Sequence, residues 1–197
     1  MKVENLPGKY QKLWAKCEAV LKKARRGDVD HAIEVVELIL NYQGKEALDQ
    51  DVLIPAAMLH DIGHAAILPE HFSMITGPKK LINGKLVHML AGAKIAWDIL
   101  NLVGYNKAKI AEIVDIVSMH DSDQLQGVDI KKIYNTKNKK IFHDVDSMDR
   151  YTEKRLKNIR NVYKDKKEVE QILKNFLDLF FYKEFKEIAE TRLAKIF

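Results

Sequence analysis

A short segment at residues 56–66 combines residue types that rarely occur together in a protein interior. It reads AAMLHDIGHAA, in which His60 and His64 flank Asp61 among apolar neighbours. Imidazole and carboxylate groups are costly to bury unless a partner compensates them. A divalent metal ion is such a partner, because it accepts the lone pair of His60 and balances the charge of Asp61. The chemistry that this segment suggests is the activation of water by a bound metal.

Further histidines and aspartates recur along the chain, about one helix and one turn apart. The dipeptide His-Asp occurs three times, at 60–61, 120–121 and 143–144. The interior of a helical bundle commonly hosts metal sites built from facing helices, so groups near successive helix ends can meet there. Five successive predicted helices present such groups, which are His31, His60 with Asp61, His88, His120 and Asp146. Taken together, the series predicts a metal site inside the bundle.

The elements that must position these groups are helices, because nearly every long segment has helical periodicity and no long alternating run occurs. The predicted helices cover about 8–26, 29–43, 46–62, 85–103, 107–120, 141–163, 166–182 and 184–197, with loops at 67–84 and 121–139. Pro55 should start or kink the regular part of the third helix. His60 and Asp61 end that helix, and Asp146 lies near the start of the sixth. The pattern predicts an all-α bundle of about seven to nine helices in a single domain.

The composition restricts the class of protein. Of the 197 residues, 47% are hydrophobic and 31% charged, as is typical of a globular domain. The single cysteine excludes an internal disulfide and a cysteine-based zinc site, and it suits a reducing, cytoplasmic setting. The longest apolar run is VLIPAAML, which is too short to span a membrane. The net charge of +5 is spread along the helices, so we expect no membrane partner and no specific nucleic-acid partner.

Five stretches carry a resemblance to a known family. They are DHAIEVVELIL at 30–40, AAMLHDIGHA at 56–65, HMLAGAKIAWDIL at 88–100, IVSMHD at 116–121 and DVDSMDR at 144–150. With the order His, His-Asp, Asp and with HDIG at its centre, the chain resembles the HD-domain metal-dependent phosphohydrolase superfamily. The resemblance covers roughly residues 25–155 and implies a bundle of five or more helices.

The resemblance also implies a set of metal ligands. Carried over position by position, they are His31, His60, Asp61 and Asp146, and the resemblance favours Asp146 over Asp144. Mixed imidazole and carboxylate ligands suit a divalent transition metal, which here means Fe, Mn, Co, Ni or Zn. The expected number is one or two ions per chain.

A second ion would need additional ligands, and the chain supplies His88 and His120 at suitable positions. Their stretches resemble the two-metal branch of the family, in which Asp61 would bridge the ions. In the alternative with one ion, these two histidines bind phosphate or support the ligands. Gly92 lies one turn past His88 and would let another backbone or a ligand approach closely.

Catalytic roles are predicted for Asp61 and His64. His64 lies four residues after His60, on the same face if the helix continues. It would contact phosphate or give a proton to the leaving oxygen.

Two other side chains are predicted to bind phosphate together with His64. Arg150 lies four residues after Asp146 and would hold phosphate with two hydrogen bonds, or else pair with Asp146 or Glu153 at the surface. Lys85 follows the HDIGH segment together with Lys79 and Lys80. These lysines either form a rim that steers phosphate or belong to a solvated loop.

Three parts of the single domain are expected. Residues 1–25 form an N-terminal helix that packs on the core, residues 26–155 form the HD-type metal-binding core, and residues 156–197 complete the domain with C-terminal helices. The phenylalanines of the last two helices are expected to pack in the core, and a homodimer contact is the alternative.

The predicted function is that of an enzyme, because the resemblance implies a metal-dependent hydrolase. We expect cleavage of a phosphomonoester or phosphoanhydride in a small nucleotide-like substrate through a metal-bound hydroxide. Three alternatives remain open: a cyclic-nucleotide phosphodiesterase, a di-iron oxygenase that uses the same six ligands, and a non-catalytic nucleotide sensor.

Overall fold

The computed structural model describes residues 5–42, 44–71, 83–163 and 165–197. Within these ranges it contains ten α-helices, nine of which have seven or more residues, and no strand. The predicted all-α class and the helix number are therefore confirmed. No helix in the described ranges is both long enough and apolar enough to cross a membrane.

The α-helices follow one another along the chain with short 3-10 turns between some of them. They are α1 (Gly8–Leu21), α2 (Asp28–Leu40), α3 (Gln50–Leu59), α5 (Gly84–Leu102), α6 (Lys107–Val117), α7 (Ile130–Ile133), α8 (Lys137–Met148), α9 (Glu153–Val162), α10 (Lys166–Leu177) and α11 (Lys183–Ile196). The 3-10 turns are η2 (Ile62–Ala66), η3 (Pro69–His71), η4 (Ser122–Gln124) and η5 (Asp149–Tyr151).

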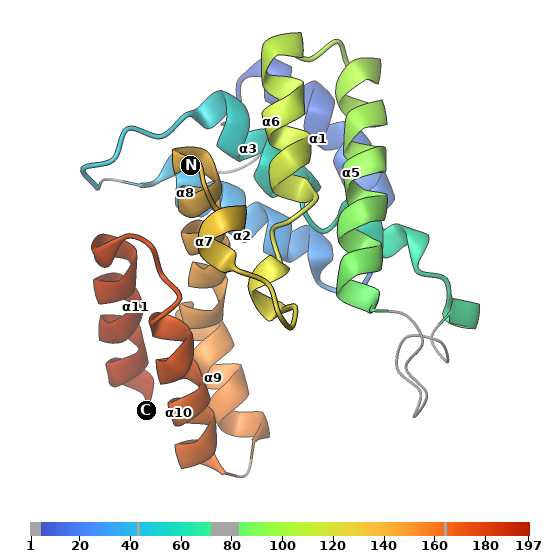
Figure 1. The fold of residues 1–197 in the computed structure, drawn as a ribbon. Helices are drawn as coiled ribbons and strands as arrows, with labels where there is room; N and C mark the ends of the chain where they lie inside the picture. Colours follow the sequence, from blue (N-terminus) through green and yellow to red (C-terminus); the bar gives the residue numbers. More distant parts are fainter. Residues whose placement is uncertain (1–4, 43, 72–82, 164) are drawn as a thin grey trace.

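Helix α3 lies at the centre of the fold, with eight of its ten residues buried. It packs against α1, α2, α6 and α8, while α9, α10 and α11 lie together beyond α8 (Figure 1). One apolar cluster extends from Leu6 to Leu193 and includes Phe185, so the C-terminal helices share the core. A helix that is apolar on all sides is stable only when it is surrounded in this way.

Pro55 is accommodated inside α3 without starting it, because the helix already begins at Gln50. A proline has no N–H, so the carbonyl of Asp51 one turn earlier loses its helical partner. The hydroxyl of Tyr105 donates to that carbonyl at 2.9 Å and replaces the missing hydrogen bond. Of the two alternatives predicted for Pro55, that it starts the regular part is therefore wrong.

The helix predicted over 141–163 is divided in the structure. Helix α8 begins earlier, at Lys137, and ends at Met148. The turn η5 follows, and α9 starts after Thr152, whose side chain accepts a hydrogen bond from the backbone N–H of Arg155. Asp146 therefore lies in the last turn of α8 and not near the start of a helix, which corrects the predicted placement.

Candidate metal centre

Three histidines of the predicted site share one orienting contact. In each, Nδ1 lies next to a backbone carbonyl one turn earlier, and because a carbonyl only accepts, Nδ1 carries the proton. In the neutral form of each ring the lone pair is then on Nε2, which is the usual arrangement of a metal-binding histidine. The pairs are His60 with Ala57 O (3.0 Å), His88 with Gly84 O (3.3 Å) and His120 with Val117 O (2.9 Å).

A first group of donors forms where α2, α3 and α8 meet. His31, His60 and Asp61 offer ligand atoms that all lie within 4.8 Å of one another. Asp146 joins them, since its Oδ1 lies 3.1 Å from His31 Nε2 and 3.5 Å from His60 Nε2. His60 Nε2 and Asp146 Oδ1 are buried and make no hydrogen bond among the described residues. Buried polar atoms are rarely left so, and a cation between them would satisfy both.

A second group of donors lies on the other side of the same aspartate. Asp61, His88 and His120 also have ligand atoms within 4.8 Å of one another. His88 Nε2 lies 3.2 Å from His120 Nε2, so two lone pairs would face each other unless a proton or a metal ion lies near them. Asp61 Oδ1 faces this group, 3.5 Å from His120 Nε2, while Oδ2 lies 3.6 Å from His60 Nε2. One carboxylate therefore faces both groups.

Two glycines allow α5 to bring His88 up to the end of α3. A Cβ built on Gly63 would lie 1.8 Å from the carbonyl oxygen of His88 and 2.5 Å from the nitrogen of Gly92. Only a residue without a side chain fits there, so the backbones of η2 and α5 are in direct contact. The close approach expected at Gly92 is thus made by the backbone of Gly63.

The charges of the two groups are strongly coupled. Burial would raise the pKa of Asp61, but the imidazoles of His60 and His120 hold it well below its usual range. Burial would likewise lower the pKa of His120, but the carboxylate of Asp61 raises it to about 9. Burial and the neighbouring His120 lower the pKa of His88 to about 3. The arrangement keeps Asp61 ionised. It also sets the pKa of His120 above, and the pKa of His88 below, the usual value for histidine.

Residues 28–195 match a family model, and its description is HD domain. The chain belongs to the HD domain family. The resemblance read from the motifs is confirmed, and the matched range contains both groups of donors. HD domain proteins are typically metal-dependent phosphohydrolases, and the buried His and Asp groups of this chain could hold metal ions. No curated protein and no solved structure matches the chain.

His64 and Lys85 lie beside the second group of this HD domain. The α-helix does not continue past His60, and η2 instead brings His64 Nε2 to 3.3 Å from Asp61 Oδ1. The ring of His64 stacks on His88 with 4.1 Å between centroids. Lys85 donates to Asp121 Oδ2 at 2.9 Å. The other two lysines of the predicted rim, Lys79 and Lys80, lie outside the described residues.

Arg150 is turned away from the donor groups, because α8 ends before it. Its Nη1 donates to Ser147 Oγ at 3.1 Å, and its guanidinium lies 4.8 Å from the ring centroid of Phe176. The expected pairing with Asp146 or Glu153 is not among its contacts with described residues. Phosphate binding by Arg150 stays a prediction, and these contacts do not support it.

Asp144 does not compete with Asp146 for a place in the cluster. Its carboxylate accepts hydrogen bonds from the backbone N–H groups of Phe181, at 3.0 Å, and Tyr182, at 2.7 Å. Asp144 therefore anchors the turn before α11. This agrees with the choice of Asp146 that the resemblance implies.

Asp149 and Arg25 both touch the cluster, and sequence reasoning missed them. Asp149 Oδ2 lies 3.2 Å from His31 Nδ1, and Arg25 Nη2 donates to Asp61 Oδ2 at 3.0 Å. Asp149 is in the quoted stretch DVDSMDR, three residues after Asp146, and that spacing was an available signal. Arg25 lies in a turn, where no periodicity indicates the direction of a side chain.

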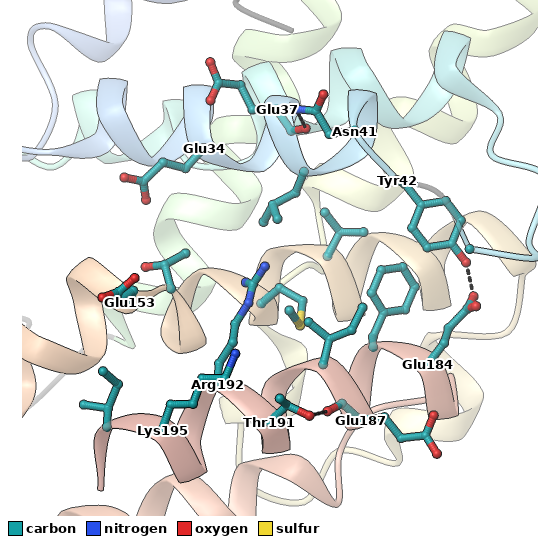
Figure 2. A pocket seen from close by; sticks show the side chains of 18 of the residues that line it. Glu34, Glu37, Asn41, Tyr42, Glu153, Glu184, Glu187, Thr191, Arg192 and Lys195 are labelled. Carbon is teal, nitrogen blue, oxygen red and sulfur yellow. Dashed lines mark hydrogen bonds between the residues drawn. The ribbon is translucent and has the colours of Figure 1, made fainter.

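A separate groove of about 1400 Å³ lies along α2 and α11. Figure 2 shows Glu34 and Glu37 on α2 at one side of the groove, and Arg192 and Lys195 on α11 at the other side. Its lining is partly apolar and includes none of the six predicted metal ligands. The predicted metal chemistry therefore lies outside this groove.

Proposed function

We propose that this HD domain is a metal-dependent hydrolase that cleaves a phosphomonoester or phosphoanhydride of a nucleotide-like substrate. The observation that carries the proposal is the position of Asp61, whose two oxygens face two groups of imidazoles, all buried except that of His31. Such a shared carboxylate is what two neighbouring ions would require. The family, whose members are typically metal-dependent phosphohydrolases, supports the same conclusion.

The donor set fits divalent transition metals. His31, His60, Asp61 and Asp146 would hold one ion, and Asp61, His88 and His120 would hold the other. Mixed nitrogen and oxygen donors suit Fe, Mn, Co, Ni and Zn. When bound, such an ion lowers the pKa of a coordinated water to about 7 and polarises a phosphoryl oxygen, and phosphate-ester hydrolysis needs both effects.

The remaining side chains have roles that follow from their positions. His64 is 3.3 Å from Asp61 and stacks on His88, so it can hold a phosphate oxygen or carry a proton for the leaving oxygen. Lys85 brings a positive charge beside the second group through its contact with Asp121. Both would orient an anionic substrate toward the buried donors.

The test combines metal analysis with a phosphate-release assay. Purified protein is reconstituted with each candidate metal and assayed on nucleoside mono-, di- and triphosphates, dinucleoside polyphosphates and cyclic nucleotides. We expect metal-dependent phosphate release from at least one substrate. Asp61→Ala should lower turnover by more than about 100-fold, because it removes the carboxylate that both groups of donors share. Each factor of ten in turnover corresponds to about 1.36 kcal/mol of activation free energy.

Asp98→Ala is the matched control, since Asp98 is an exposed aspartate that pairs only with Lys94 among the described residues. It should leave turnover unchanged. Turnover of Asp61→Ala within tenfold of the wild type would contradict the catalytic assignment. Cleavage of cyclic nucleotides alone would favour a phosphodiesterase, and oxygen consumption by an iron-coloured protein without phosphate release would favour an oxygenase.

A further inference from the structure

Arg25 reaches the shared aspartate from the turn between α1 and α2. Its Nη2 donates to Asp61 Oδ2 at 3.0 Å, on the oxygen that faces His31 and His60. A guanidinium and a metal ion are both cations, and they repel each other at one carboxylate oxygen. A metal at the first group would therefore weaken this hydrogen bond and make the Nη2 donor available to another anion.

A buried carboxylate keeps the Arg25 side chain beside the cluster even if Asp61 releases it. Arg25 Nε donates to Asp28 Oδ1 at 3.2 Å, and the backbone N–H of Arg25 donates to Asp28 Oδ2 at 3.0 Å. Asp28 is only 4% exposed, so this carboxylate does not move freely. The guanidinium is thus tethered at Nε and also at Nη2, which lies 3.1 Å from Asp28 Oδ1, and only Nη1 has no contact with the Asp28 carboxylate.

The outer part of the guanidinium is open to a ligand. The Arg25 side chain is 57% exposed, and Nη1 makes no hydrogen bond to a described residue. A guanidinium binds phosphate oxygens through two parallel hydrogen bonds, which a lysine cannot do. On the side of the second group, Lys85 supplies another positive charge. A phosphate beside the cluster would therefore find a cation near each group of donors.

We propose that Arg25, tethered by Asp28, binds a phosphate group of the substrate once a metal occupies the first group. The inference rests on the proposed function, because it takes the ligand to be a phosphorylated substrate. Arg25 lies before residue 28, where the match to the family model begins, so the family model does not include it. The inference depends on the contacts that Arg25 makes with both Asp28 and Asp61.

The test measures binding of inorganic phosphate to the full chain loaded with Mn²⁺, by isothermal titration calorimetry. We expect Arg25→Gln to weaken phosphate binding by at least about tenfold, the cost of losing a charge-assisted hydrogen bond. Arg25→Lys should recover part of this loss. Arg26→Gln is the matched control, because Arg26 is the next residue, is exposed and has no partner among the described residues. It should stay within about twofold of the wild type, as an exposed charge contributes little.

A second measurement separates phosphate binding from a structural role. Mn²⁺ affinity without phosphate should be unchanged or tighter in Arg25→Gln, since a competing cation is removed from Asp61. Weaker Mn²⁺ binding or a lower melting temperature in this variant would overturn the inference. If Arg25→Gln bound phosphate as tightly as the wild type, the inference would be overturned and the proposed function would not. A wild-type protein that binds Mn²⁺ but no phosphate would overturn both the inference and the proposed function.

Discussion

His31 meets a carboxylate at each of its ring nitrogens. Nε2 lies 3.1 Å from Asp146 Oδ1, and Nδ1 lies 3.2 Å from Asp149 Oδ2. Asp149 is 3% exposed and holds Arg155 at 3.4 Å on its outer side. The nearby carboxylates raise the pKa of His31 although burial would lower it. Asp149 thus occupies the position of the outer carboxylate that orients a metal-binding histidine and increases its basicity.

Replacing Asp149 should weaken metal binding without removing a ligand. Asp149→Asn keeps the shape of the side chain and loses its charge, and we expect Mn²⁺ affinity to fall about 10- to 100-fold. The measurement is a calorimetric Mn²⁺ titration. The control is Asp98→Asn, which makes the same substitution at an exposed aspartate. Unchanged affinity in Asp149→Asn would show that His31 does not depend on this contact.

The residues of the cluster differ in how far sequence reasoning can predict them. His60 and Asp61 are conspicuous because polar groups in an otherwise apolar helix need a partner. Asp149 offers only its spacing from Asp146 as a signal, and Arg25 offers none, since aspartate and arginine in a turn are ordinary surface residues. Their roles depend on which chain segments meet, and the sequence does not state this.

At the scale of elements, the contact between η2 and α5 determines where His88 lies. The backbones touch at Gly63 and Gly92, and this contact places the part of α5 from His88 to Gly92 against η2, which follows α3. The second group of donors therefore depends on two residues that carry no chemistry themselves.

Adding a methyl group at this contact should separate the two elements. In Gly63→Ala the new Cβ would lie 1.8 Å from the backbone oxygen of His88, so the backbone must shift. We expect a loss of about 1–3 kcal/mol in the free energy of unfolding, as is usual for overpacking, and weaker metal binding.

The control is Gly8→Ala, because a Cβ at Gly8 meets no atom within 4 Å and lies in a helix, where alanine is favoured. Urea unfolding and Mn²⁺ titration of both variants measure the two effects. Equal stability of Gly63→Ala and the wild type would mean that the elements can separate at no cost.

The elements themselves were predictable where side-chain periodicity and capping agree. Asn106 caps α6, with its side chain accepting from the N–H of Ala108, and Gly104 ends the preceding segment with a φ of +67°. The break at η5 was not predictable, because helical periodicity continues through it. There the hydroxyl of Tyr151 donates to the carbonyl of Leu173 at 2.7 Å, a contact between segments far apart in sequence. Asp146 was misplaced along its helix for the same reason.

At the scale of the whole molecule, one buried histidine links the metal-binding region to the C-terminal helices. His143 Nδ1 lies 3.0 Å from Asp144 Oδ1, and Nε2 lies 3.8 Å from Asp123 Oδ2 of η4. Asp144 in turn accepts the backbone N–H groups that precede α11. The rings of Tyr134 and Phe181 cover the imidazole at 4.8 and 5.2 Å between centroids. The charge of His143 therefore balances two carboxylates from separate parts of the fold.

This link should make stability depend on pH. Burial would lower the pKa of His143, but Asp123 and Asp144 raise it to about 9 in the folded protein, above the usual value of 6.5. The stabilisation is therefore complete below about pH 6.5 and is lost as the pH rises through 9. His143→Gln lacks it, so the difference in unfolding free energy between wild type and variant should shrink by on the order of 3 kcal/mol from pH 6 to pH 10. Urea unfolding at several pH values measures this difference, with His71→Gln as the control. A difference that stays constant with pH would show that folding does not raise the pKa of His143.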